Sequence, residues 1–223
     1  MFTGIVQEMG KIVARENVHA TAGHAVRFTV SAPAVAPKLS IGDSVACDGA
    51  CLTVETLVRS TESAKENATG FTVCAIPETL SKTTLDLWAV GGFINLESAL
   101  TAQAPLGGHF VLGHVDGVCE VVSVNDLGDR SSENGGREVT VRLPAEFLTY
   151  CVYKGSITLS GVSLTIAAVE NDTVRVALIP HTLEVTTLGM AVPRGRVNFE
   201  VDILAKHIER QLSLRAAAGK VGA

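Results

Sequence analysis

The segment GGHFVLGHVDG (residues 107–117) combines two histidines, one aspartate and four glycines. Histidine and aspartate bind metals and transfer protons, and glycine-rich turns can hold phosphate. His109 and His114 lie five residues apart, so on a strand they face opposite sides and a shared metal is disfavoured. The glycines lie among strand-like residues with no helix following, which disfavours a phosphate site. We therefore keep His114 alone as a candidate for proton transfer, because the ordinary pKa of histidine lies near neutrality.

The five cysteines, at positions 47, 51, 74, 119 and 151, form an odd set. Cys47 and Cys51 are four residues apart, not the tighter Cys-x-x-Cys pairing common in zinc sites, and no His-x-x-x-His pair accompanies them. We expect reduced thiols and no bound metal. The stretch MFTGIVQEMGK lacks the basic residues and apolar run of a signal peptide, so we expect a cytoplasmic protein.

The composition excludes two classes of partner. The net charge of -5 disfavours nucleic acid, whose phosphates require a basic surface. No apolar run approaches the roughly 18 residues of a membrane helix. Hydrophobic residues make up 47% and charged residues 18% of the 223 positions, which leaves apolar material for a core and for subunit interfaces.

The chain is a tandem duplication. Residues 73–97 match residues 176–200 at eleven of 25 positions, with an offset of 103. Residues 44–54 match 156–166 at an offset of 112, and residues 3–12 match 112–121 more weakly at an offset of 109. The three blocks keep the same order, and the changing offsets indicate loops of different length, mainly at 61–70 and 125–138. Two copies of about a hundred residues indicate a pair of domains rather than a solenoid.

Each copy is predicted to be mostly β, with six short strands rich in Val, Ile, Thr and Phe. The predicted strands are 10–15, 25–32, 43–47, 51–58, 71–76 and 92–98 in the first copy, and 117–124, 137–144, 155–159, 163–169, 173–179 and 196–202 in the second. Six strands in so short a copy favour a small closed barrel, which has no exposed edge. Short helices are predicted at 77–85 and 144–151, each beginning at a proline.

The sequence therefore predicts an all-β protein of two similar six-stranded barrels followed by a C-terminal α-helix. The predicted domains are 1–97, 98–201 and 202–223. In the helix, predicted over 203–218, Leu204, Ile208 and Leu212 form one apolar stripe. Because this helix belongs to neither copy, we expect it to mediate oligomerisation.

Six motifs, in this order along the chain, resemble the riboflavin synthase family, of the bacterial alpha-subunit type: MFTGIVQ, GACLTV, GGHFVLGHVDG, GVSLTI, IPHTLEVTTLG and VNFEVD. The resemblance covers residues 1–202. It implies Greek-key barrels, a homotrimer assembled by the C-terminal helix, and a dismutation of two 6,7-dimethyl-8-ribityllumazine molecules to riboflavin and 5-amino-6-(ribitylamino)uracil. It implies no metal or organic cofactor. Each barrel would bind one lumazine, and the active site would form between the N-terminal barrel of one subunit and the C-terminal barrel of a neighbour.

The resemblance also implies the substrate-binding residues. The first barrel would use Gly4, Ile5, Val6, Ser44, Cys51, Leu52, Thr53, Cys74, Ala75, Ile76, Pro77, Glu78 and Thr79. The second would use Gly113, His114, Val115, Lys154, Ser163, Leu164, Thr165, Ile179, Pro180, His181, Thr182, Leu183 and Glu184. Two positions depart from the family pattern: His181 replaces the acidic counterpart of Glu78, and Cys74 stands where a polar residue is common.

The catalytic candidates are His114, Ser163, Asp202 and Cys51. His114 aligns with Ile5, Ser163 with Cys51 and Asp202 with Ala99, so the polar groups gather in the second copy, and this asymmetry would give two identical substrates different roles. His114 would transfer protons, Ser163 would orient water or bond a ring edge, Asp202 would stabilise a cation, and Cys51 is a conceivable nucleophile.

Plainer roles stay open for the same residues. Asp202 can be the N-cap of the tail helix, Ser163 and Thr165 ordinary strand residues, His114 a loop histidine and Lys154 a solvated turn residue. The alternative function is that of a non-catalytic relative that binds lumazine or flavin in the same fold.

Overall fold

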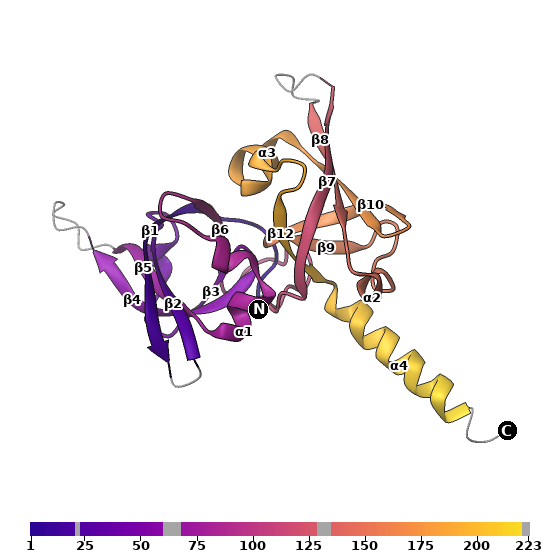
Figure 1. The fold of residues 1–223 in the computed structure, drawn as a ribbon, viewed down its shortest axis with the longest axis horizontal. Helices are drawn as coiled ribbons and strands as arrows, with labels where there is room; N and C mark the ends of the chain where they lie inside the picture. Colours follow the sequence, from indigo (N-terminus) through magenta and orange to yellow (C-terminus); the bar gives the residue numbers. More distant parts are fainter. Residues whose placement is uncertain (21–22, 60–67, 129–134, 220–223) are drawn as a thin grey trace.

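The computed structural model describes residues 1–20, 23–59, 68–128 and 135–219. It consists of two β-barrels and a long C-terminal helix (Figure 1). The strands of the first barrel are β1 (Glu8–Ala20), β2 (Gly23–Ser31), β3 (Ser44–Cys47), β4 (Ala50–Arg59), β5 (Ala68–Ala75) and β6 (Phe93–Ser98). All neighbouring strands are antiparallel, in the closed order β1-β2-β5-β4-β3-β6. This order is a Greek key.

The second barrel repeats this topology. Its strands are β7 (Gly117–Leu127), β8 (Gly136–Arg142), β9 (Ser156–Leu159), β10 (Val162–Glu170), β11 (Thr173–Leu178) and β12 (Arg196–Val201). Read from β7, the closed order is β7-β8-β11-β10-β9-β12, which is the order of the first barrel. The two predicted barrels and their twelve strands are confirmed.

The strand ends differ from the predicted ends. β1 was expected over 10–15 but pairs with β2 as far as Ala20. At residues 16–18 neither face of the strand is buried, so the apolar alternation stops while the backbone pairing continues. In the same way, residues 125–127 of the expected loop 125–138 belong to β7 and residues 136–138 to β8. Residues 61–67 and 129–134 of the two expected loops lie outside the described residues.

Each barrel encloses its own apolar core. In β2, Val26, Phe28 and Val30 alternate inward and are fully buried. The Trp88 ring packs edge-on against Phe28, with ring centroids 5.0 Å apart. In the second barrel the equivalent interior contains Phe199 and its neighbours on β9 and β10.

Short helices close the barrels: α1 (Pro77–Lys82), the 3-10 helix η2 (Thr84–Leu87), α2 (Ala145–Leu148), α3 (Pro180–Val185) and η3 (Thr187–Met190), together with η1 (Ala36–Lys38). α1 and α2 lie where helices were predicted. α3 was not predicted, although it is the second copy of α1 and also has proline in its first turn.

Buried amides join the two barrels at equivalent positions. The Asn95 side chain donates to the carbonyl oxygen of Ser160 (2.8 Å), and the Asn198 side chain donates to that of Asp48 (2.8 Å). Each asparagine thus bonds the β-turn of the opposite barrel. Because these groups are buried and satisfied, the junction holds the barrels in one relative orientation.

The C-terminal helix α4 (Ile203–Gly219) projects away from both barrels (Figure 1). Leu204, Ile208 and Leu212 are 51%, 61% and 55% exposed. The helix and its apolar stripe are confirmed, and the stripe is uncovered within the single chain. Among the described helices, none has the length and apolar character needed to cross a bilayer.

Candidate active sites

The beginnings of the two copies run side by side between the barrels. Phe2 and Val111 exchange backbone hydrogen bonds of 2.7 and 3.2 Å, and the His109 N–H donates to the Thr3 carbonyl. Phe2 and Val111 are almost completely buried. This short antiparallel contact carries each segment across the junction to the other barrel.

The two segments therefore complete each other's sites. The Cys51 N–H, in the first barrel, donates to the Gly113 carbonyl (2.8 Å), and the Ser163 N–H, in the second, donates to the Gly4 carbonyl (2.8 Å). Val115 packs against the first core and Val6 against the second.

This arrangement corrects the predicted grouping, which placed Gly4, Ile5 and Val6 in the first site and Gly113, His114 and Val115 in the second. The repeat alignment identifies equivalent segments, but exchanging two equivalent segments leaves the alignment unchanged. The sequence pattern therefore could not distinguish the two groupings.

Glycine is required at both crossing points. Gly4 and Gly113 have φ of +77° and +76°, in the left-handed region. A Cβ on Gly4 would lie 2.6 Å from the Ser163 Cβ, and one on Gly113 would lie 2.7 Å from the Cys51 Cβ. The strands β4 and β10 can approach the segments this closely only because neither residue has a side chain.

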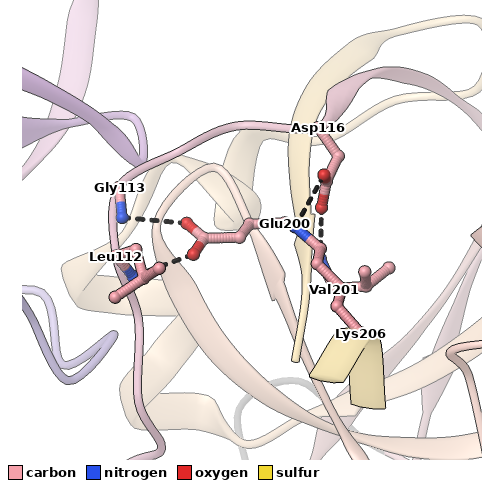
Figure 2. Close-up of polar contacts among 6 residues, drawn as sticks. All are labelled: Leu112, Gly113, Asp116, Glu200, Val201 and Lys206. Carbon is pink, nitrogen blue, oxygen red and sulfur yellow. Dashed lines mark hydrogen bonds and ion pairs between the residues drawn. The ribbon is translucent and has the colours of Figure 1, made fainter. Parts of the chain in front are cut away.

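Two buried glutamates anchor the segments to their own barrels. Glu97 accepts hydrogen bonds from the N–H and hydroxyl of Thr3 and from the Gly4 N–H, at 2.7 to 2.9 Å. Glu200 likewise accepts from the N–H groups of Leu112 (2.8 Å) and Gly113 (3.0 Å) (Figure 2). Burial raises the pKa of both carboxyl groups, and the donated hydrogen bonds partly oppose this rise. The sequence analysis missed both residues, although Asn-x-Glu recurs at the offset of 103.

A second carboxylate, that of Asp116, lies next to Glu200 and also accepts a backbone hydrogen bond. Asp116 accepts from the Val201 N–H (2.9 Å) and pairs with the Lys206 ammonium (2.7 Å) (Figure 2). Lys206 lies in the first turns of α4, so this ion pair connects the helix to the segment that carries His114. Asp202 caps α4 by accepting from the Leu204 N–H (2.9 Å), as its plainer role predicted.

The first site is a cavity of about 290 Å³ beside Cys51. It is lined by Ala50, Cys51, Glu78, Thr79, Lys82, Thr83, Gly113, His114 and Val115. Cys51 is half-buried and His114 is exposed. A thiol and an imidazole thus lie in one cavity, although they come from different copies of the repeat.

The second site contains a histidine that the sequence analysis set aside. The Nδ1 atom of His109 lies 2.7 Å from the Ser163 hydroxyl, and its Nε2 atom lies 3.5 Å from the Thr158 hydroxyl. His109 is buried, which lowers its pKa, while the charge of Asp202 opposes this shift. The neutral imidazole is therefore favoured, and with its proton on Nε2 it can accept the Ser163 hydroxyl proton.

The geometry groups the catalytic candidates differently from the sequence pattern, and their catalytic roles stay predictions. His114 is not the single chemical candidate of its segment, because residues 109–113 do not form a regular strand and His109 meets a residue from β10. The polar groups of the second copy are divided between the two barrels: His114 lies beside Cys51, whereas Ser163 contacts His109. Because the segments cross, a residue from one copy of the repeat can contribute to the site of the other barrel.

The other predicted site residues lie around these two centres. Ser44 and Thr53 pair across β3 and β4. The predicted residues of 76–79 and 179–184 lie at or next to α1 and α3. Five of them are exposed: Ile76, Glu78, Ile179, His181 and Glu184. Pro77, Thr79, Pro180 and Thr182 are partly exposed, and Leu183 packs against the second core. Leu52, Ala75 and Leu164 face the barrel interiors, so only their backbones are available. Lys154 is exposed at a turn, with its ammonium 5.1 Å from the Tyr153 ring.

The comparisons with known proteins agree with this architecture. The family model for the lumazine binding domain matches residues 3–99 and 112–202. The riboflavin synthase of Mycobacterium tuberculosis (strain ATCC 25618 / H37Rv) is 39% identical over 213 residues, covering 94% of this chain and 97% of that protein. That of Bacillus subtilis (strain 168) is 35% identical over 212 residues, covering 95% and 90%.

Among solved structures, LumP complexed with riboflavin matches with a TM-score of 0.75 and 22% identity, covering 90% of this chain and 99% of LumP. LumP complexed with 6,7-dimethyl-8-(1'-D-ribityl) lumazine matches with a TM-score of 0.73. At this identity the likeness shows a shared fold. The full-length relatives and both matched domains show that the chain belongs to the riboflavin synthase family.

Proposed function

We propose that this chain catalyses the dismutation of two 6,7-dimethyl-8-ribityllumazine molecules into riboflavin and 5-amino-6-(ribitylamino)uracil. The observation that carries the proposal is that each barrel places a histidine beside a side chain that can act as a nucleophile. Cys51 and His114 share one cavity, and Ser163 is bonded to His109 in the other barrel. A protein that only bound a ligand would have no need for two differently equipped sites.

The stoichiometry of this reaction is self-contained. The two products together hold the atoms of the two substrates, so one lumazine gives up a four-carbon unit and the other receives it. No external oxidant or reductant is needed, and we propose that the protein uses no cofactor. Within the described residues, no three His, Cys, Asp or Glu side chains cluster as metal ligands.

The two sites suit two chemical roles. One lumazine must lose a proton from its C7 methyl group, and the other must be attacked at C7 by a nucleophile. We assign the attack to the second barrel, where neutral His109 removes the proton of the Ser163 hydroxyl or of a water held by it. We assign the proton transfer to His114 in the first barrel, with Cys51 contacting the same ligand. Holding the two rings together lowers the activation free energy further, by up to about 7–11 kcal/mol in favourable cases.

The two ligands must meet, and we propose that they do so between subunits of a homotrimer. The uncovered stripe of α4 supports assembly through this helix. Lys206 connects α4 to the Asp116 carboxylate, so an assembly through α4 would also fix the segment that completes the first site. Each active site would then combine the first barrel of one subunit with the second barrel of a neighbour.

The cysteines support the proposed cytoplasmic location. All five are free in the structure, as expected for a reducing compartment. Cys47, Cys119 and Cys151 are buried, and burial raises the pKa of each thiol. These three are therefore inert core residues, and only Cys51 and Cys74 are accessible to a ligand.

The test is to incubate the purified protein with 6,7-dimethyl-8-ribityllumazine alone and to follow riboflavin by its absorbance and fluorescence. Riboflavin formation supports the synthase. Tight binding of the lumazine without riboflavin would instead support the alternative, a non-catalytic lumazine or flavin carrier. The same titration gives the number of lumazines bound per chain, for which we expect two.

A further inference from the structure

Outward-facing residues form a polar row across four strands of the first barrel. Ser44 on β3 pairs with Thr53 on β4, and Cys74 on β5 pairs with Arg27 on β2. β4 and β5 are neighbours, so the four positions follow one another across the sheet. Three of them are expected substrate-binding residues, and Arg27 is the fourth position, at the end of the row.

The second barrel has the same row with a different end. Ser156 on β9 pairs with Thr165 on β10, and Ala177 on β11 pairs with Glu138 on β8. The serine and threonine positions are retained by the duplication, whereas the other two have diverged. The row ends on a guanidinium in the first barrel and on a carboxylate in the second.

The charged neighbours of Arg27 leave part of its donor capacity free. Glu55 accepts from Nε (2.6 Å) and Nη2 (3.3 Å) of Arg27, and the two side chains are 40% and 33% exposed. A guanidinium has five N–H groups, so three remain for a ligand. Glu16 faces Arg27 from β1, which prevents a strong local positive charge. Any recognition at this end therefore relies on directed N–H donors more than on net charge.

Glu138 offers the opposite chemistry. The Arg175 guanidinium lies 3.6 Å from it and also pairs with Glu170 at 3.3 Å. One guanidinium therefore serves two carboxylates. The end of the second row presents acceptors and negative charge, and it has no N–H group of its own to offer a ligand oxygen.

We propose that Arg27 and Glu138 determine specificity at the polyol end of the two ligand sites, so that the first site accepts a ribityl chain ending in a phosphate and the second rejects it. This inference rests on the proposed function, since it requires a ribityl ligand lying along each row. The ring lies at the Cys51 or Ser163 end, near the acid–base groups, and the ribityl chain extends towards the fourth position. Guanidinium N–H groups bind phosphate oxygens well, whereas a carboxylate repels them.

The test compares riboflavin with flavin mononucleotide, which differs only by the terminal phosphate, in calorimetric titrations of the full chain. We expect two riboflavins but one flavin mononucleotide per chain. Arg27→Gln should weaken the binding of flavin mononucleotide at least tenfold and should change the affinity for riboflavin less. Glu138→Gln should create a second site for flavin mononucleotide. Arg142→Gln and Asp172→Asn are the matched controls, because the two side chains are exposed, ion-paired with each other and outside the row.

Equal stoichiometry for the two flavins would overturn the inference, as would an Arg27→Gln variant that loses both flavins to the same extent. Both results leave the proposed function intact if lumazine is still converted to riboflavin. Failure of both flavins and of the lumazine to bind would contradict the proposed function and this inference together.

Discussion

The Ser163–His109 contact is the most specific chemical feature at the level of single residues. The hydroxyl and the imidazole are 2.7 Å apart, and burial lowers the pKa of the imidazole, which favours its neutral form. We expect His109→Gln and Ser163→Ala each to lower kcat by about 10²-fold or more, as for loss of a general base. If the two residues act as a unit, the double variant should be no slower than the slower single variant.

Steady-state kinetics of the two single variants and the double variant measure this coupling. His24→Gln, which removes an exposed histidine from β2, is the control and should retain normal kcat. Multiplicative losses in the double variant would mean that His109 and Ser163 act separately.

At the scale of the elements, the crossed segments predict an effect between barrels. Glu200 belongs to the second barrel but holds Gly113, which covers Cys51 in the first. Glu200→Gln replaces one acceptor oxygen by an amide NH2 group, which can only donate, and should loosen this segment, at about 1–3 kcal/mol for the lost bond. We expect faster alkylation of Cys51, measured by mass spectrometry. Glu97→Gln, the equivalent change in the first barrel, should leave Cys51 unchanged, and equal labelling in both variants would contradict the crossing.

The helix α4 makes the second prediction at this scale. Ile208→Glu places a charge at the centre of the exposed stripe without breaking the helix. We expect the assembly to dissociate to monomers, as determined by light scattering coupled to size exclusion. Arg210→Glu changes the opposite face and should preserve the assembly. A persisting trimer in Ile208→Glu would show that α4 does not hold the subunits together.

The elements also show which features could be predicted from the sequence and which could not. The strands and α4 were predictable because apolar periodicity and turn residues are local signals. Cys51 and Ser163 were identified as candidates from motifs at equivalent places in the repeat, and their roles are proposals. The segment crossing, the glutamate contacts and the His109 contact were not predictable, because each depends on residues at least 54 positions apart that meet only when the barrels have packed.

At the scale of the whole molecule, the junction between the barrels contains a carboxyl group that responds to pH. Asp48 is buried in the turn between β3 and β4, and burial raises its pKa to about 7, opposed by hydrogen bonds from the Asn95 N–H and the Trp88 side chain. Folding therefore favours the protonated form. The stability contributed by Asp48 is complete below the ordinary pKa of about 3.9 and is lost as the pH rises through about 7.

Asp48→Asn keeps an acceptor oxygen but carries no charge at any pH. We expect it to reduce the loss of unfolding free energy between pH 4 and 8 and to raise the Tm at pH 8; one pKa unit corresponds to about 1.4 kcal/mol. Urea titrations at several pH values measure this slope. Asp172→Asn alters an exposed aspartate and should leave the dependence of the unfolding free energy on pH unchanged. An identical slope in the wild type and Asp48→Asn would contradict a protonated Asp48 at the junction.

The central claim is that one chain brings two differently equipped lumazine sites to one reaction. The most direct measurement is the ratio of substrate consumed to products formed when 6,7-dimethyl-8-ribityllumazine is the only addition, with Ser163→Ala as the comparison. We predict two lumazines consumed for each riboflavin and each 5-amino-6-(ribitylamino)uracil, at a much lower rate in the variant. Lumazine bound at both sites but never converted, or converted equally fast by Ser163→Ala, would contradict the account.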